Sequence, residues 1–118
     1  MITKLLRLAF VTAMLLSFAV ALAPAPELPS GIDHADKIAH FLAYLGLGLI
    51  GLFAWPRHAL AVCVVLLAHG ALVEVAQSLT GYRYGDVQDW LADAAGVLVA
   101  LLIHRRVAVW FGAGKPLR

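Results

Sequence analysis

The chain has 118 residues, which suffices for one domain and excludes a two-domain enzyme. Hydrophobic residues make up 63% and charged residues 14%, with a mean hydropathy of +0.89. This composition excludes most soluble folds, because a chain of this size cannot bury so much apolar surface. The net charge of +2 comes from basic residues near the chain ends and in short turns, without an aromatic-interleaved basic patch, so no nucleic-acid partner is expected. Cys63 is the only cysteine, which excludes a disulfide framework and a multi-cysteine metal site.

A lipid bilayer is therefore the expected surrounding for most of the chain. A helix needs about 20 mostly apolar residues to cross the hydrocarbon core. Four stretches approach this length, at about 5–23, 38–55, 59–79 and 87–103. A proline-rich segment, 24–31, separates the first two, while Pro56 and Gly81 follow the second and third. The sequence predicts an all-α fold, an antiparallel bundle of four transmembrane helices.

The first stretch has two interpretations. Lys4 and Arg7 precede an apolar run that ends in Ala21-Leu22-Ala23, as in a cleavable signal peptide. The run is longer than the usual one of about 7–15 residues, and proline follows it directly, which favours a retained membrane anchor. We expect three parts, namely an N-terminal helix with a proline-rich linker (1–29), a transmembrane domain (30–105) and a basic tail (106–118).

Basic residues indicate the orientation, because cytoplasmic loops carry an excess of Lys and Arg. With the N-terminus in the cytoplasm, two basic residues, Lys37 and Arg83, lie outside and seven lie inside. The inside group is Lys4, Arg7, Arg57, Arg105, Arg106, Lys115 and Arg118. All seven acidic residues lie in the outer loops or in the outer halves of the helices. We therefore expect both termini in the cytoplasm and the acidic residues toward the outer side.

Two carboxylates lie inside predicted spans. At a rise of about 1.5 Å per residue, Glu74 is about 8 Å and Asp93 about 9 Å below the outer helix ends. Such residues are costly in lipid, so they face the bundle interior or a wet cavity and mark function by default. On the second span, Lys37, His40 and Tyr44 recur at spacings of three and four and share one helix face.

The other spans show similar faces. Gln77 shares a face with Glu74, and Asp89 shares one with Asp93, while small residues continue all three faces toward the inner side. We expect the faces to meet in a seam that opens outward as a polar pocket, with Arg83 reaching over it to a carboxylate or an anionic ligand. The candidate ligand-binding residues are Asp36, Lys37, His40, Tyr44, Glu74, Gln77, Arg83, Asp89 and Asp93.

Structural roles are open for several of these candidates. Asp36 and Asp89 are placed to cap their helices, and Lys37 is placed to extend to the membrane surface. The Tyr44 hydroxyl needs a hydrogen-bond partner, for which Glu74 is a candidate. Glu74 is also placed to join helices together with its neighbour on the same face. Only the deeper aspartate of the fourth span has no capping role.

Three motifs carry a resemblance to a known family. The first is Asp36-Lys37-Ile38-Ala39-His40-Phe41-Leu42-Ala43-Tyr44, the second is Gly70 with Glu74-Val75-Ala76-Gln77, and the third is Arg83 with Asp89-Trp90-Leu91-Ala92-Asp93-Ala94-Ala95-Gly96. They resemble the patterns D-K-x-x-H-F-x-x-Y, G-x-x-x-E-x-x-Q and R-x5-D-x-x-x-N-x-x-G of the VanZ-like family of bacterial membrane proteins. The likeness covers about residues 30–105, and it departs at Asp93, where the family often has asparagine.

The resemblance implies a protein of the bacterial cytoplasmic (inner) membrane that acts at the cell envelope. The family is named for a member linked to resistance to the glycopeptide teicoplanin. Our leading interpretation is a multi-pass membrane protein whose outward-facing polar pocket binds a lipid-linked or lipidated ligand. Two alternatives stay open. One is a membrane-embedded enzyme acting on an envelope lipid or phosphate-containing substrate, with His40 and acidic residues as acid and base. The other is a proton or ion pathway.

The expected partners are the lipid bilayer and a lipid or lipoglycopeptide ligand. No cofactor is expected, and no metal either, because one histidine among scattered carboxylates is a weak metal signature. His69 is expected to make a packing contact between helices. The oligomeric state is left open by the sequence.

Overall fold

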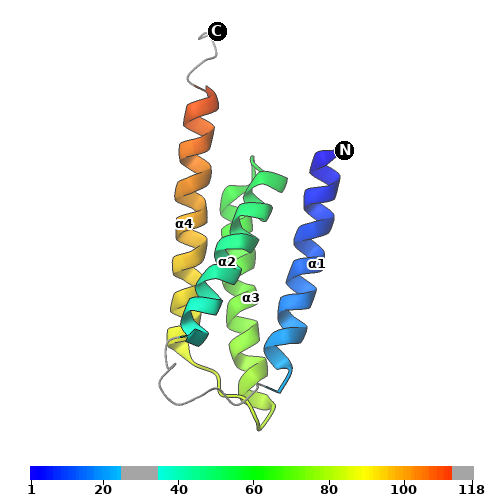
Figure 1. Cartoon of the computed structure of the whole chain (residues 1–118), viewed down its shortest axis with the longest axis vertical. Coiled ribbons are helices and arrows are strands. Elements are labelled where there is room, and N and C mark those ends of the chain that lie inside the picture. Colours follow the sequence, from blue (N-terminus) through cyan, green and yellow to red (C-terminus); the bar gives the residue numbers. More distant parts are fainter. Residues whose placement is uncertain (25–34, 113–118) are drawn as a thin grey trace.

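The computed structural model describes residues 1–24 and 35–112. These form four helices, α1 (Ile2–Leu22), α2 (Ala35–Ala54), α3 (Ala59–Leu79) and α4 (Val87–Gly112), and no strand (Figure 1). All four are long and apolar enough to cross a membrane, which confirms the predicted all-α, four-span fold. The proline-rich segment from residue 25 onward, and Lys115 and Arg118 of the tail, lie outside the described residues.

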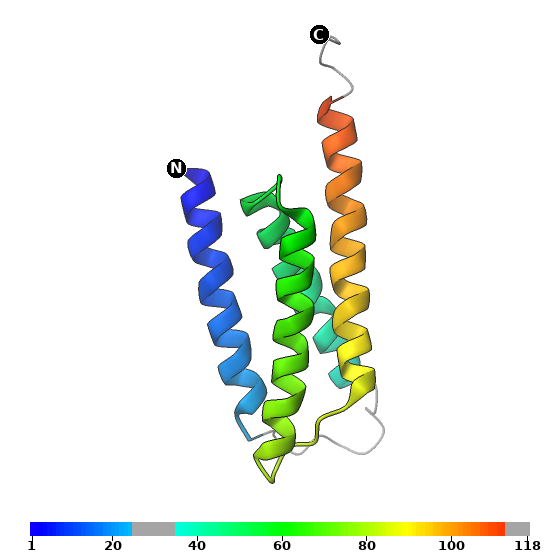
Figure 2. The same ribbon diagram turned by 180° about the vertical axis from the view of Figure 1, so that it is seen from behind.

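The helices run alternately up and down, so both ends of the described chain lie at the same end of the bundle (Figures 1 and 2). α4 extends well past the predicted end at residue 103 and projects beyond the other helices. Arg105 and Arg106 are exposed there, so the helix continues through them without burying a charge. Many large apolar side chains on all four helices are exposed, as expected of surfaces that face lipid.

The closest helix pair is α2 with α4, and α1 packs on α2 and α3 but not on α4. Small residues explain the close approach of α2 and α4. A Cβ atom added at Gly48 would lie 2.6 Å from the Cβ of Ala100, and one added at Gly96 would meet the backbone carbonyl of Phe41. We call this contact, made by Gly48, Gly96 and Ala100, the α2–α4 seam. The seam fixes the separation at which side chains of the two helices meet.

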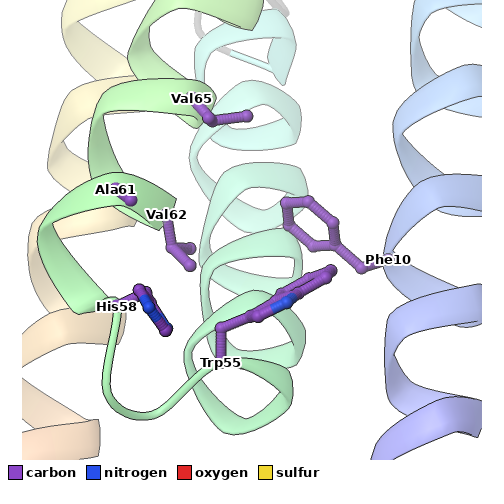
Figure 3. A pocket seen from close by; sticks show the side chains of 6 residues that line it. All are labelled: Phe10, Trp55, His58, Ala61, Val62 and Val65. Carbon is purple, nitrogen blue, oxygen red and sulfur yellow. The ribbon is translucent and has the colours of Figure 1, made fainter.

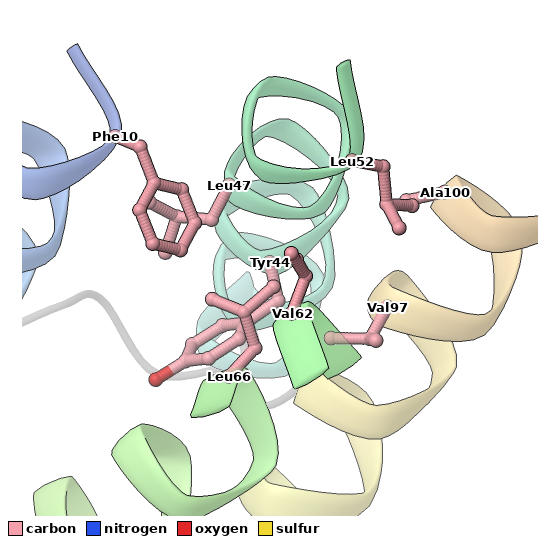
Figure 4. Packing of buried hydrophobic residues seen from close by; sticks show 8 residues of the cluster. All are labelled: Phe10, Tyr44, Leu47, Leu52, Val62, Leu66, Val97 and Ala100. Atoms are coloured by element: carbon pink, nitrogen blue, oxygen red, sulfur yellow. The ribbon is translucent and has the colours of Figure 1, made fainter. Parts of the chain in front are cut away.

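The apolar core draws on all four helices (Figure 4). It consists of Phe10, Tyr44, Leu47, Leu52, Val62, Leu66, Val97 and Ala100. Phe10 is the only buried residue of α1, and its ring packs edge-on against Trp55 with the ring centroids 5.4 Å apart. Beside it a hollow of about 480 Å³ opens between α1 and α3, lined by Val62, Val65 and other residues without a carboxylate (Figure 3). The acidic side chains therefore lie elsewhere in the bundle.

Candidate functional site

Ionisable side chains gather at the end of the bundle opposite the chain ends. There the start of α2, the start of α4 and the end of α3 lie together, which is the lower end in Figure 1. We call the group the polar cluster; it comprises Asp36, Lys37, His40, Glu74, Asp86, Asp89 and Asp93. The predicted meeting of charged residues from three helices is therefore present in the structure.

His40 and Asp93 form the centre of the polar cluster. The Nδ1 atom of His40 lies 2.8 Å from Oδ1 of Asp93, whose side chain is 0% exposed. With the carboxylate as acceptor, Nδ1 carries the hydrogen and Nε2 is the free nitrogen. Nε2 faces Asp89 Oδ2 at 3.8 Å and Asp36 Oδ1 at 3.9 Å, which is beyond hydrogen-bonding distance. The imidazole is thus oriented by a buried carboxylate and turned toward two others.

Lys37 joins α2 to the start of α4. Its Nζ lies 3.3 Å from Asp86 Oδ2 and 3.4 Å from Asp89 Oδ1, so the side chain binds two carboxylates of this chain. Asp86 also caps α4, because its Oδ1 accepts the N–H of Gln88 at 2.8 Å. This backbone hydrogen bond, and then Lys37, lower the pKa of the Asp86 carboxyl from its ordinary value. The cap of α4 is therefore Asp86, which leaves Asp89 free to face α2.

Glu74 connects α3 to the loop before α4. Its Oε2 accepts the backbone N–H of Asp86 at 2.8 Å, and Gly85 allows the loop to pass close to the Glu74 carbonyl, since a Cβ there would clash with it. Its other oxygen, Oε1, is buried without a hydrogen-bond partner among the described residues. The Glu74 side chain thus holds the loop with one oxygen and presents the second to the bundle interior.

Tyr44 binds His69, and the expected pairing of Tyr44 with Glu74 is wrong. The two side chains are joined by a 2.8 Å hydrogen bond between the Tyr44 hydroxyl and Nδ1 of His69, while Nε2 of His69 lies 3.1 Å from the carbonyl of Met14. A carbonyl only accepts, so Nε2 is the protonated nitrogen and Nδ1 accepts the hydrogen of the hydroxyl. His69 therefore makes the interhelical contact predicted for it, and it links α3 to both α1 and α2.

Arg83 and Gln77 reach α1 instead of the polar cluster. Arg83 Nε donates to the carbonyl of Ala23 at 2.9 Å, and Gln77 Nε2 donates to that of Ala21 at 2.9 Å. The Tyr82 hydroxyl donates to the neighbouring carbonyl of α1 at 2.7 Å. The last carbonyls of a helix have no partner within it, and these donors satisfy them. The expected contact of Arg83 with a carboxylate is absent from the described part of the chain.

Of the hollows that adjoin the polar cluster, two share Asp36. A recess of about 290 Å³ at the bundle end is lined by Asp36, Gln77, Tyr82, Arg83, Tyr84, Asp86 and Asp89. A cleft of about 190 Å³ is lined by Ser17, Val20, Ala21, Asp36, Ala39, His40, Ala43, Tyr44, Val73 and Arg83, which come from α1, α2, α3 and the turn after α3. Asp36 and Arg83 line both hollows, so a polar space and a mostly apolar one lie side by side.

One contributor to this region, Asp86, is missing from the candidates predicted from the sequence. Its spacing from Asp89 and Asp93 places it on the same helix face as these two residues. His69 makes the predicted interhelical contact, but nothing in its surroundings along the chain indicates Tyr44 as its partner. The six candidates that come together are Asp36, Lys37, His40, Glu74, Asp89 and Asp93, while Tyr44, Gln77 and Arg83 bind other groups.

Four apolar helices with ionisable side chains gathered at one end of the bundle define a class, the polytopic α-helical membrane proteins. Within that class, a family model described as VanZ/LLP1 matches residues 2–110, and the chain belongs to this family. The match confirms the resemblance drawn from the three motifs and extends over α1. Neither the curated proteins nor the solved structures give a match to the chain.

Proposed function

We propose that this protein binds an amphipathic molecule of the bacterial cell envelope, either lipid-linked or lipidated, at the end of the bundle that holds the polar cluster. The observation that carries the proposal is the pair of adjoining hollows that share Asp36 and Arg83. A headgroup fits the polar recess, and an acyl or prenyl chain fits the cleft beside α1. Ligand sites commonly combine an apolar lining with a few placed polar groups.

The charges of the site suit a headgroup with mixed polarity. Acidic groups line the recess from α2 and from the start of α4, whereas Arg83 supplies a guanidinium at the edge shared by both hollows. Arg83 uses Nε and one terminal nitrogen on α1 carbonyls, at 2.9 and 3.5 Å. Further N–H groups of the guanidinium are available to a phosphate or carboxylate.

The location is part of the proposal. The end of the bundle with the chain termini carries basic residues and no acidic ones. This excess of positive charge favours a cytoplasmic position for that end in the inner membrane. The polar cluster then faces the outer side, where lipid-linked cell-wall intermediates and lipoglycopeptide antibiotics such as teicoplanin are present. The proposal includes a role in resistance to such antibiotics, which membership of the VanZ/LLP1 family supports.

The test is a binding measurement on the purified full chain in detergent, with teicoplanin and a phosphatidylglycerol-containing nanodisc as probes. Ala43→Leu fills the cleft, since Ala43 lines it and is exposed. Ala95→Leu is the matched control, because Ala95 is exposed on α4 and lines neither hollow. We expect native mass spectrometry to show bound probe with the wild type and with Ala95→Leu, and loss of binding with Ala43→Leu.

Asp36→Asn tests the headgroup side, because Asp36 lines both hollows and lies 3.9 Å from His40, beyond hydrogen-bonding distance. We expect a weaker complex with an unchanged melting temperature. Equal binding by all variants, or binding that parallels their thermal stability alone, would show that the hollows are not a ligand site.

Catalysis is a second candidate function, favoured by the orientation of His40. Asp93 holds Nδ1, so Nε2 is free to take a proton, and His40 lines the cleft. A buried carboxylate that orients an imidazole is a recurrent acid–base arrangement. Turnover of a radiolabelled phospholipid or lipid-linked phosphate by the wild type, lost in His40→Ala, would establish it. The proton pathway gains no comparable support, because among the described residues His104 is the one buried titratable side chain in the other half.

A further inference from the structure

Two carboxylate oxygens within the polar cluster are buried and have no hydrogen-bond partner in the described part of the chain. They are Oδ2 of Asp93, whose side chain is 0% exposed, and Oε1 of Glu74. Oδ2 points toward α3, since it would lie 2.8 Å from a Cβ added at Gly70, one turn from Glu74. An unsatisfied charged oxygen is costly in a buried position, and more so within a membrane.

The neighbouring donors of the described residues are directed elsewhere. Lys37 binds Asp86 and Asp89, and Arg83 binds carbonyls of α1. The Tyr44 hydroxyl also lies close to Gly70, but its hydrogen is donated to His69. Protein donors around the two orphan oxygens are thus already used, and a cation or an added proton from outside the chain would satisfy them.

We propose that His40, Glu74 and Asp93 bind one divalent cation of the kind that accepts imidazole and carboxylate ligands, such as Zn²⁺ or Mn²⁺. One ligand atom from each residue lies within 4.8 Å of the others. The 2.8 Å between His40 Nδ1 and Asp93 Oδ1 is shorter than the roughly 3.0–3.4 Å between neighbouring ligands that each lie about 2.1 Å from one ion, so these two atoms move slightly apart when the ion replaces the hydrogen between them. Two carboxylates and a divalent ion are also neutral together, which removes the cost of net charge in lipid.

The second ring nitrogen of His40 is turned toward two carboxylates that support the metal site. When the ion takes the place of the hydrogen on Nδ1, that hydrogen moves to Nε2, which faces the carboxylates of Asp89 and Asp36 at 3.8 and 3.9 Å. Ligating histidines commonly donate their second nitrogen to a carboxylate, and Asp89 and Asp36 are the carboxylates toward which Nε2 is turned. A second acidic group of the cluster, formed by Asp36, His40 and Asp89, is less suited to the ion, because Lys37 already neutralises Asp89.

The inference goes beyond the amphipathic ligand and does not depend on it. The full chain, carrying a purification tag without histidine, is treated with EDTA and titrated with Zn²⁺ or Mn²⁺ alone by isothermal calorimetry, without any lipid probe. We expect one ion per chain, and an affinity at least about 10–100-fold lower in Glu74→Gln and in Asp93→Asn. His58→Ala is the matched control, since His58 is exposed on the opposite side of the bundle, and it is expected to bind as the wild type does.

A second readout covers the case in which a variant does not fold. In wild-type protein with ¹⁵N-labelled histidine, metal is expected to move the hydrogen of His40 from Nδ1 to Nε2, which NMR detects. Absence of stoichiometric binding to the wild type would overturn the proposal. So would an infrared carboxylic-acid band that persists in the presence of metal and disappears in Asp93→Asn, because a shared proton would then satisfy the two oxygens.

Discussion

The α2–α4 seam and the polar cluster lie next to each other on the same pair of helices, yet different forces hold them. In the seam, Gly96 and Gly48 bring the two backbones together, and no side chain longer than a methyl group separates them. In the polar cluster, one turn away, His40 and Asp93 span the same helices with a hydrogen bond. The seam sets the distance between α2 and α4, and the cluster depends on that distance.

The seam is expected to show the largest effect of a small substitution. In Gly96→Ala the new Cβ would meet the Phe41 carbonyl and lie 2.9 Å from the backbone nitrogen of Leu45, and backbone atoms cannot move aside. We expect a loss of about 3 kcal/mol, at the upper end of overpacking effects, measured by thermal unfolding in detergent. Gly46→Ala is the matched control, because nothing lies within 4 Å of its added Cβ, and a gain of up to about 1 kcal/mol is expected from helix propensity. Equal effects at the two glycines would contradict the role of the seam.

The buried pair His40–Asp93 of the polar cluster is expected to have the second largest effect on stability. A double-mutant cycle with His40→Ala and Asp93→Ala measures the coupling between the two side chains. We expect about 1.5–3 kcal/mol, because the hydrogen bond involves a carboxylate that is fully buried. Additive destabilisation would show that Asp93 does not orient the imidazole.

The ion pair of Lys37 with Asp86 lies on the exposed side of the polar cluster and is expected to stabilise the fold less than the buried pair. Their side chains are 29% and 42% exposed, so water and salt screen the interaction. We expect the cycle of Lys37→Met and Asp86→Asn to give a much weaker coupling than the buried pair, and one that vanishes in concentrated salt. A coupling insensitive to salt would mean that this pair is also shielded from water.

Low pH is expected to produce the smallest change in stability. The pKa of Asp86 is lowered by the N–H of Gln88 and by Lys37, so its charge stabilises the folded state fully above the ordinary pKa of 3.8. That contribution is lost as the pH falls below 3.8 and through the lowered pKa of the folded protein. Asp86→Asn retains the helix cap and has no charge to lose. The melting temperature of the wild type should therefore fall toward that of the variant in acid; parallel curves would contradict the lowered pKa.

The sequence predicts the helices and the inward faces well, because apolar length and helical spacing are local properties. Lys37, His40 and Asp93 were placed together for that reason, and they do meet. Spacing does not determine how each helix is rotated or which helix lies beside it. The partners of Tyr44 and Arg83 depend on how α1 and α3 pack against α2 and against each other, and this packing leaves no signal in either residue's own neighbourhood along the chain.

The attachment of α1 to the turn after α3 has a consequence for how the chain tolerates change. Gln77, Tyr82 and Arg83 all donate to main-chain carbonyls at the end of α1. Every amino acid supplies such an oxygen, so these hydrogen bonds do not depend on which side chains α1 carries at its end. The lipid-facing residues of α1 can therefore change during evolution without loss of these hydrogen bonds. The three donor residues are restricted, because their side chains make the contacts.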